Sequence, residues 1–119
     1  MIEIRTKLYE TEDVDKLKKH LEEAFGIRFE ISGSELIGKD EKLDCLSKMR
    51  EQIKSRGIEP TVREVILTLS KREQGTKIKL NKQAICKGIF NFIEEDLPLG
   101  AIEINIDLPP EEVLNFLGI

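Results

Sequence analysis

Residues 80–106 read LNKQAICKGIFNFIEEDLPLGAIEINI, and this stretch decides much of the fold. Apolar and polar residues alternate over 101–108, which predicts a strand with one wet face. The apolar and aromatic residues of 89–93 predict a second strand. Segment 94–100 is rich in acids, proline and glycine, as turns are. The stretch therefore indicates two neighbouring strands joined by a polar connection.

The chain before this stretch continues the same pattern. Thr76, Ile78 and Leu80 alternate with Lys77 and Lys79, so we expect a half-buried strand with a basic outer face. Residues 81–88 are ambiguous. A short helical turn, with an asparagine as cap and a glycine as stop, fits slightly better than a continued strand, because the alternation fails there.

The remaining elements follow from periodicity. The predicted elements are a strand at 2–8, a helix at 14–25, a hairpin at 27–39, a helix at 43–56, a helix opened by the capping box Thr61-Val62-Arg63-Glu64, and a last helix after Pro109-Pro110. The order is βαββααβββα. This order predicts a single α+β domain over 1–119, with two layers: a mostly antiparallel or mixed sheet, and helices packed on one face.

Charge is segregated along the chain. Residues 61–92 carry seven bases and two acids, whereas 93–119 carry seven acids and no Lys or Arg. The first sixty residues are nearly balanced, so the overall net charge of −4 conceals the segregation. This is the main functional signal that the sequence gives.

The basic part suggests a nucleic-acid contact. The candidate RNA-binding residues are Lys71, Arg72, Lys77, Lys79, Asn81, Lys82, Gln83 and Lys87. Lysine and arginine would bind phosphates, and the two amides would hydrogen-bond phosphate, ribose or base edges. The alternative is a solvated strand face, which the acidic pI of about 5.2 favours. Phe90 and Phe92 share a strand face, but ordinary core packing explains them better than stacking on bases.

The sequence holds no pattern typical of an enzyme. His20 is the only histidine, no Gly-rich phosphate fingerprint is present, and no cofactor or metal-ligand spacing occurs. Cys45 and Cys86 lie in unrelated segments, so we expect buried, reduced thiols. The absence of a signal sequence or long apolar run predicts a cytoplasmic protein with no membrane contact. The high charge in both signs also suits a thermophile.

One set of residues has a recognisable spacing: Leu80-Asn81-Lys82-Gln83-Ala84, Gly88, Asn91-Phe92, Pro98-Leu99-Gly100 and Ile102-Glu103. Together they closely resemble the central signature of a family of small archaeal proteins of unassigned function, described as predicted RNA-binding or exosome-subunit-like. The resemblance extends along the whole chain. It implies a fold similar to the large-subunit ribosomal protein that holds the small ribosomal RNA.

Two classes of function stay open. In the first, the protein is an RNA-binding accessory protein that contacts the phosphate backbone through the basic strand and the turn after it. In the second, it is a module for protein interaction or self-assembly, such as an exosome-like assembly or a homo-oligomer, in which acidic and basic surfaces of different chains meet. RNA binding should weaken steeply with salt, whereas self-assembly should depend on protein concentration.

Overall fold

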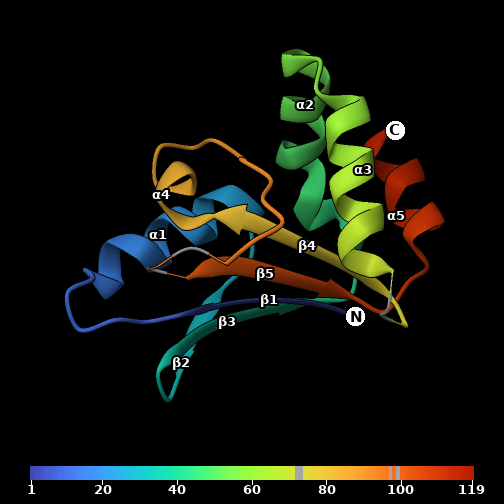
Figure 1. Cartoon of the computed structure of the whole chain (residues 1–119). Helices are drawn as coiled ribbons and strands as arrows, with labels where there is room; N and C mark the ends of the chain where they lie inside the picture. Colours follow the sequence, from blue (N-terminus) through green and yellow to red (C-terminus); the bar gives the residue numbers. More distant parts are fainter. Residues whose placement is uncertain (72–73, 97, 99) are drawn as a thin grey trace.

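The computed structural model describes residues 1–71, 74–96, 98 and 100–119. Within these residues, five strands form one sheet with the order β2-β3-β1-β5-β4, and every neighbouring pair is antiparallel. The strands are β1 (Ile2–Lys7), β2 (Phe29–Ser32), β3 (Glu35–Asp40), β4 (Thr76–Asn81) and β5 (Ala101–Ile106). Figure 1 shows the sheet as one layer with the helices above it.

The helices form the second layer. They are α1 (Val14–Phe25), the 3₁₀ turn η1 (Leu43–Leu46), α2 (Ser47–Arg56), α3 (Glu59–Ser70), α4 (Lys82–Ile85) and α5 (Pro110–Leu117). Alternate strand residues face this layer and are buried, among them Ile4 in β1, Ile78 in β4 and Ile104 in β5. Each buried side chain of this size contributes about 1.5–3 kcal/mol. The predicted α+β class, with an antiparallel sheet and helices on one face, is confirmed.

The helical turn after β4 is also confirmed. Asn81 caps α4, because its Oδ1 accepts a hydrogen bond from the Ala84 N–H at 3.0 Å. Gly88, beyond the turn, has a left-handed backbone with φ of 76°, which glycine adopts without steric penalty. The alternative, a continued strand through 81–88, is therefore wrong.

The strand predicted at 89–93 is wrong. Only an isolated bridge joins Phe92 to Leu80. Two backbone hydrogen bonds accompany this bridge, from the Asn81 N–H to the Asn91 carbonyl and from the Ile93 N–H to the Lys79 carbonyl. The backbone around Phe90 is bound by side chains of α2 instead: Gln52 accepts from the Phe90 N–H and donates to the Gly88 carbonyl, and Arg56 donates to the Phe90 carbonyl. Backbone groups with these partners cannot also join a strand ladder. The order βαββααβββα therefore loses one strand and gains α4.

The capping box at Thr61 is wrong as well. Helix α3 begins earlier, at Glu59, with Pro60 in its first turn and Ile58 as a cap without a side-chain hydrogen bond. Proline is tolerated there because the first N–H groups of a helix have no intrahelical partner. Thr61 lies exposed inside the first turn. Pro60 therefore belongs to the helix.

Both cysteines are free thiols, as predicted. Cys45 is buried beneath the helices, whereas Cys86 is only half-buried. The expectation that both are buried therefore holds for Cys45 alone. No helix among the described residues is long and apolar enough to cross a membrane.

Candidate nucleic-acid interface

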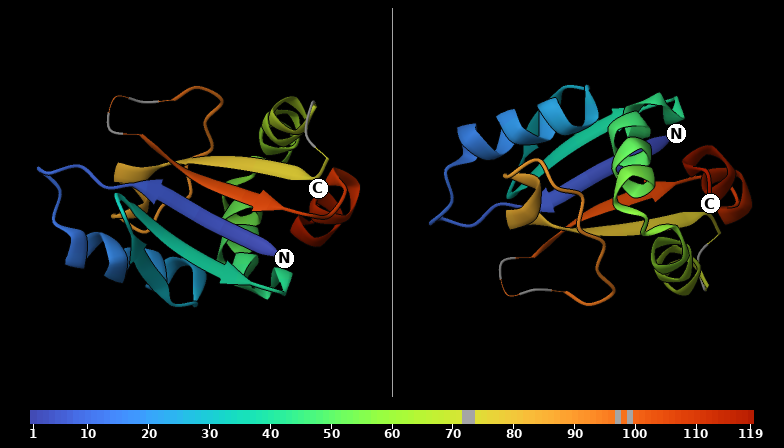
Figure 2. Two further views of the ribbon diagram at one scale, coloured as in Figure 1. Left: turned by 90° about the horizontal axis from the view of Figure 1, so that it is seen from below. Right: turned by 90° about the horizontal axis from the view of Figure 1, so that it is seen from above.

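The sheet has one face that the helix layer does not cover, and we call it the open face. Figure 2 shows it from below, with the strands in front of the helices. Its side chains alternate with the buried core residues, and all are half-buried or exposed. They are Glu3, Arg5, Lys7, Glu30, Ser32, Glu35, Ile37, Lys39, Lys77, Lys79, Asn81, Glu103 and Asn105. Five of these are bases and four are acids.

The bases of the open face lie next to acids of neighbouring strands. In the ladder, Lys77 and Lys79 of β4 are opposite Asn105 and Glu103 of β5. Lys77 Nζ lies 3.7 Å from the Glu103 carboxylate, and Lys79 Nζ lies 3.0 Å from Asp96 in the connection before β5. The Lys79 hydrogen bond lowers the pKa of the Asp96 carboxyl. This ion pair anchors the acidic connection to the end of β4.

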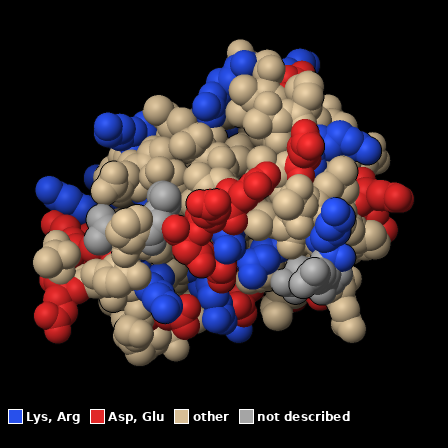
Figure 3. Space-filling model, viewed as in Figure 1, with Lys and Arg blue, Asp and Glu red and all other residues tan. Residues whose placement is uncertain are grey.

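The same pairing continues across β1 and β3. Arg5 lies 2.6 Å from Glu3 and 3.8 Å from Glu35, and Lys39 lies 3.8 Å from Glu3. Figure 3 shows basic and acidic groups interleaved on the visible side of the molecule. The charge segregation of the sequence is therefore compensated in part within the folded chain, because Lys77 of β4 pairs with Glu103 of β5, and Lys79 pairs with Asp96.

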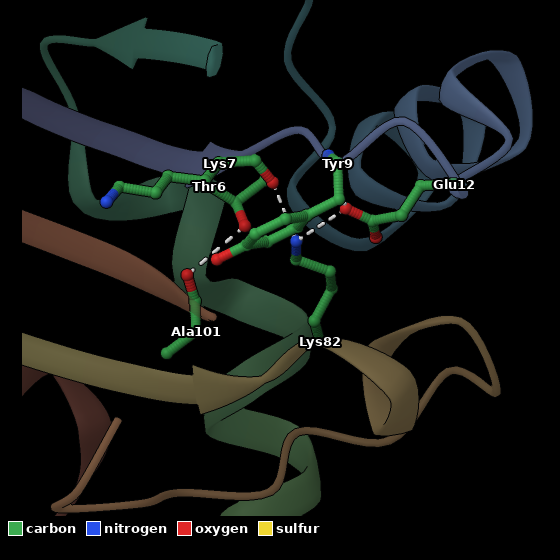
Figure 4. A network of polar contacts seen from close by, with 6 residues as sticks. All are labelled: Thr6, Lys7, Tyr9, Glu12, Lys82 and Ala101. Atoms are coloured by element: carbon green, nitrogen blue, oxygen red, sulfur yellow. Dashed lines mark hydrogen bonds and ion pairs between the residues drawn. The ribbon is translucent and has the colours of Figure 1, made fainter. Parts of the chain in front are cut away.

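Lys82 does not belong to the open face. It is buried, and its ammonium lies 2.7 Å from the Lys7 carbonyl and 3.0 Å from Glu12 Oε1. It also lies 5.0 Å from the centre of the Tyr9 ring (Figure 4). The prediction that Lys82 reaches solvent to contact phosphates is wrong, because this side chain ties α4 to the connection between β1 and α1.

The other candidate residues do not form one patch. Lys71 follows α3 at the start of β4, whereas Lys87 and Gln83 are exposed around α4 at the far end of that strand. A strand of six residues is about 20 Å long, so Lys71 is far from the other two. Asn81 is half-buried and occupied as a cap. Arg72 lies outside the described residues.

The phenylalanines are core residues. Phe90 is buried and packs edge-on against Phe25, with ring centres 5.7 Å apart. Phe92 is half-buried and packs against the core. Neither lies on a strand of the open face, which agrees with the preference for core packing over stacking on bases.

A cavity of about 250 Å³ lies at the end of the open face, where β1 ends and β5 begins. Its lining includes Arg5 and Lys7, Glu35 and Glu103 from neighbouring strands, Asp96 from the connection, and Tyr9. The sequence reasoning missed Tyr9. The signal that could have indicated it is its position as the only tyrosine, two residues after a strand whose last two outward residues, Arg5 and Lys7, are bases.

Gly100 shapes this end of the sheet. It has a φ of 81°, and a Cβ placed on it would lie 3.4 Å from the Tyr9 hydroxyl. Thr6 fixes the neighbouring strand, because its hydroxyl donates to the Ala101 carbonyl at 3.1 Å (Figure 4). Within the described part of the chain, no group of three or more His, Cys, Asp or Glu side chains is arranged to hold a metal ion.

Comparisons with known proteins agree on one family. A family model described as RNA binding matches residues 1–108. A UPF0201 protein of Pyrobaculum neutrophilum is 33% identical, over 81% of this chain and 72% of that protein.

Two solved structures have the same fold. The crystal structure of an uncharacterised UPF0201 protein has a TM-score of 0.78 and 31% identity, and the match covers 95% of this chain and 88% of that one. The UPF0201 protein from Methanococcus jannaschii has a TM-score of 0.75 and 25% identity, over 98% and 90% of the two chains. This chain therefore belongs to the archaeal UPF0201 family, whose model is described as RNA binding.

Proposed function

We propose that this protein binds RNA through the open face of its sheet, as a binding protein and not as an enzyme. The observation that carries the proposal is a sheet face with five bases that the helix layer leaves uncovered. The family's description as RNA binding supports it, since the match spans the strands that form this face.

The ion pairs on the open face do not prevent phosphate binding. Exposed or half-exposed ion pairs contribute only about 0–1 kcal/mol each, because water and salt screen them. The Lys79 side chain is only 12% exposed, so a phosphate would reach its ammonium by replacing the Asp96 carboxylate, whose side chain is 75% exposed and can turn to water. The near balance of charge predicts modest affinity, below that of strongly basic RNA-binding domains.

The acids on the open face favour single strands over duplexes. A duplex presents phosphates to a protein surface, and carboxylates such as Glu35 and Glu103 would repel them. An unpaired strand also exposes base edges with N–H donors, which carboxylates accept well. The alternation of bases and acids therefore fits single-stranded RNA that contacts the face with both backbone and bases.

The test is RNA affinity as a function of salt, measured by fluorescence anisotropy with labelled single-stranded and hairpin RNAs. One variant removes three bases of the open face: Lys7→Gln, Lys39→Gln and Lys77→Gln. The matched control removes three bases of α1: Lys16→Gln, Lys18→Gln and Lys19→Gln. Both variants have the same net charge, so any difference in RNA affinity between them reflects the positions of the substituted lysines.

Each lost phosphate contact on a single strand should reduce the slope of log affinity against log salt by about 0.7. The magnitude of the slope should therefore be smaller by about 2 in the open-face variant and unchanged in the control. Both variants should keep the wild-type melting temperature. Equal losses in the two variants would leave only nonspecific attraction. Absence of binding by the wild type at about 100 mM salt and micromolar protein would refute the proposal.

The resemblance to exosome-subunit-like proteins and to a ribosomal RNA-binding fold adds a finer proposal, in which the RNA contact occurs within a larger assembly. A pull-down from native lysate, with and without nuclease, tests it. Partners that are lost after nuclease treatment are bound through RNA, whereas partners that are retained bind the protein directly. The charge segregation argues for assembly only in part, because the chain pairs Lys77 with Glu103 and Lys79 with Asp96 internally.

A further inference from the structure

The cavity at the end of the open face combines an aromatic ring, two basic side chains and three carboxylates around a small volume. We propose that it receives one unpaired RNA base, which packs on Tyr9 and donates hydrogen bonds to the carboxylates. The inference rests on the proposed RNA binding and names the class of base that this part of the face selects.

The volume limits the ligand to a single base. Sites for drug-sized molecules span about 300–1,000 Å³, and this cavity has about 250 Å³. A whole nucleotide would not fit inside, but a base can enter while its sugar and phosphate remain outside. Arg5 and Lys7 lie at the cavity as well, so they are placed to contact the phosphates on either side of the inserted base.

Tyr9 is held in position for stacking. One side of its ring is covered by the Lys82 ammonium, 5.0 Å from the ring centre (Figure 4). Lys82 is buried and does not line the cavity, whereas Tyr9 does. The Tyr9 backbone is also fixed, because its N–H donates to Glu12 at 3.0 Å. A ring held on one side is a rigid platform for a base on the other.

The carboxylates define which bases fit. Glu35, Glu103 and Asp96 carry only acceptors when ionised, so they bind bases that present N–H₂ donors. Adenine, cytosine and guanine have an exocyclic amino group, whereas uracil presents one N–H between two carbonyl oxygens that carboxylates repel. The cavity should therefore prefer each of these three bases to uracil by about tenfold, the ratio expected for one well-made hydrogen-bonding edge.

The chain provides its own reporter for this proposal. It has one tyrosine and no tryptophan, so the intrinsic fluorescence of the native protein comes from Tyr9. Stacking of a base on the ring should quench this emission. We expect short oligo(A) and oligo(C) to quench it at the concentrations at which they bind, and oligo(U) to bind about tenfold more weakly. Inorganic polyphosphate has no nucleobase. It should compete with RNA for the Lys and Arg side chains of the open face without quenching the Tyr9 emission.

Two variants separate the ring from its hydroxyl. Tyr9→Phe should keep the preference for oligo(A) over oligo(U), and Tyr9→Leu should lose it, while both keep the salt slope of wild type. Binding of oligo(A) with unchanged Tyr9 emission and no preference over oligo(U) would overturn the base cavity and leave the proposed RNA binding intact. Absence of binding by every oligonucleotide would instead overturn the proposed function.

Discussion

Lys82 gives the most direct test of the reasoning from the structure, because the sequence suggested a surface ligand and the fold buries the residue. Its side chain is 4% exposed and its partner Glu12 is 16% exposed. The charged groups are 3.0 Å apart, and the Lys7 carbonyl lies 2.7 Å from the same ammonium. At an effective dielectric constant of about 20, the gross attraction between the two charges is about 5 kcal/mol.

Only part of this attraction is a net gain, since both groups lose hydration on folding. Lys82→Met keeps the length of the side chain, but the Glu12 carboxylate then has only the Tyr9 N–H and water as hydrogen-bond partners. We therefore expect a loss of about 2–4 kcal/mol in the free energy of unfolding. Glu12→Gln leaves the more deeply buried ammonium without its counter-charge. That variant should lose at least as much, about 3–5 kcal/mol.

The assay is urea unfolding of wild type, both single variants and the double variant, analysed as a double-mutant cycle. The double variant should be more stable than the sum of the two losses predicts, with a coupling energy of about 1–3 kcal/mol that changes little with salt. A Lys82→Met loss below about 0.5 kcal/mol, or a coupling energy near zero, would mean that water separates the pair and that Lys82 is available to ligands after all.

Three further outcomes are expected. Gly75→Ala should destabilise the fold by about 1–3 kcal/mol in urea unfolding, because its Cβ would lie 2.1 Å from the Ile106 carbonyl oxygen, whereas Gln74→Ala next to it should be neutral within about 0.5 kcal/mol. Lys79 lowers the pKa of Asp96 below its usual 3.8, so a carboxyl NMR titration should show a higher Asp96 pKa in Lys79→Gln than in the wild type. The stabilisation by this ion pair is fully present above pH 3.8 and disappears as the pH falls through the lowered pKa of the folded protein. Burial raises the pKa of Cys45 to about 11, so thiol titration at pH 8 should modify Cys86 first and Cys45 only on unfolding. The free energy of unfolding should also fall as the pH rises from about 9 towards 11, because the unfolded state loses the thiol proton first.

The fold was predictable where one face of an element is buried and the other is wet. The strand at 76–81 shows this, because its alternation of Ile and Lys becomes alternating burial in the sheet. Prediction failed at 89–93, where the residues are typical of a strand but the backbone of Phe90 bonds to the side chains of Gln52 and Arg56. Those two partners are more than thirty residues away in the sequence, and a local pattern contains no information about them.

The candidate site was harder to predict than the fold. A lysine in a polar sequence looks the same whether it faces solvent, as Lys87 does, or closes a buried network, as Lys82 does. What separates the two is the position of Glu12, seventy residues earlier, which lies beside Lys82 only because β1 and α1 meet the end of β4. Tyr9 was missed for the same reason, since its role depends on a cavity formed by three separate segments.

Three of the residues that carry the family resemblance lie at one corner of the fold. Asn81 caps α4, Lys82 joins that turn to the connection after β1, and Gly100 leaves space for the Tyr9 ring. The side chains of Asn81 and Lys82 are bonded within the protein, and Gly100 has none, so these three residues build the corner at which Tyr9 and the cavity lie. A substitution of any of the three should therefore change the proposed RNA binding through loss of structure, with a lower melting temperature. A substitution among the bases of the open face should change the proposed binding while the melting temperature stays constant.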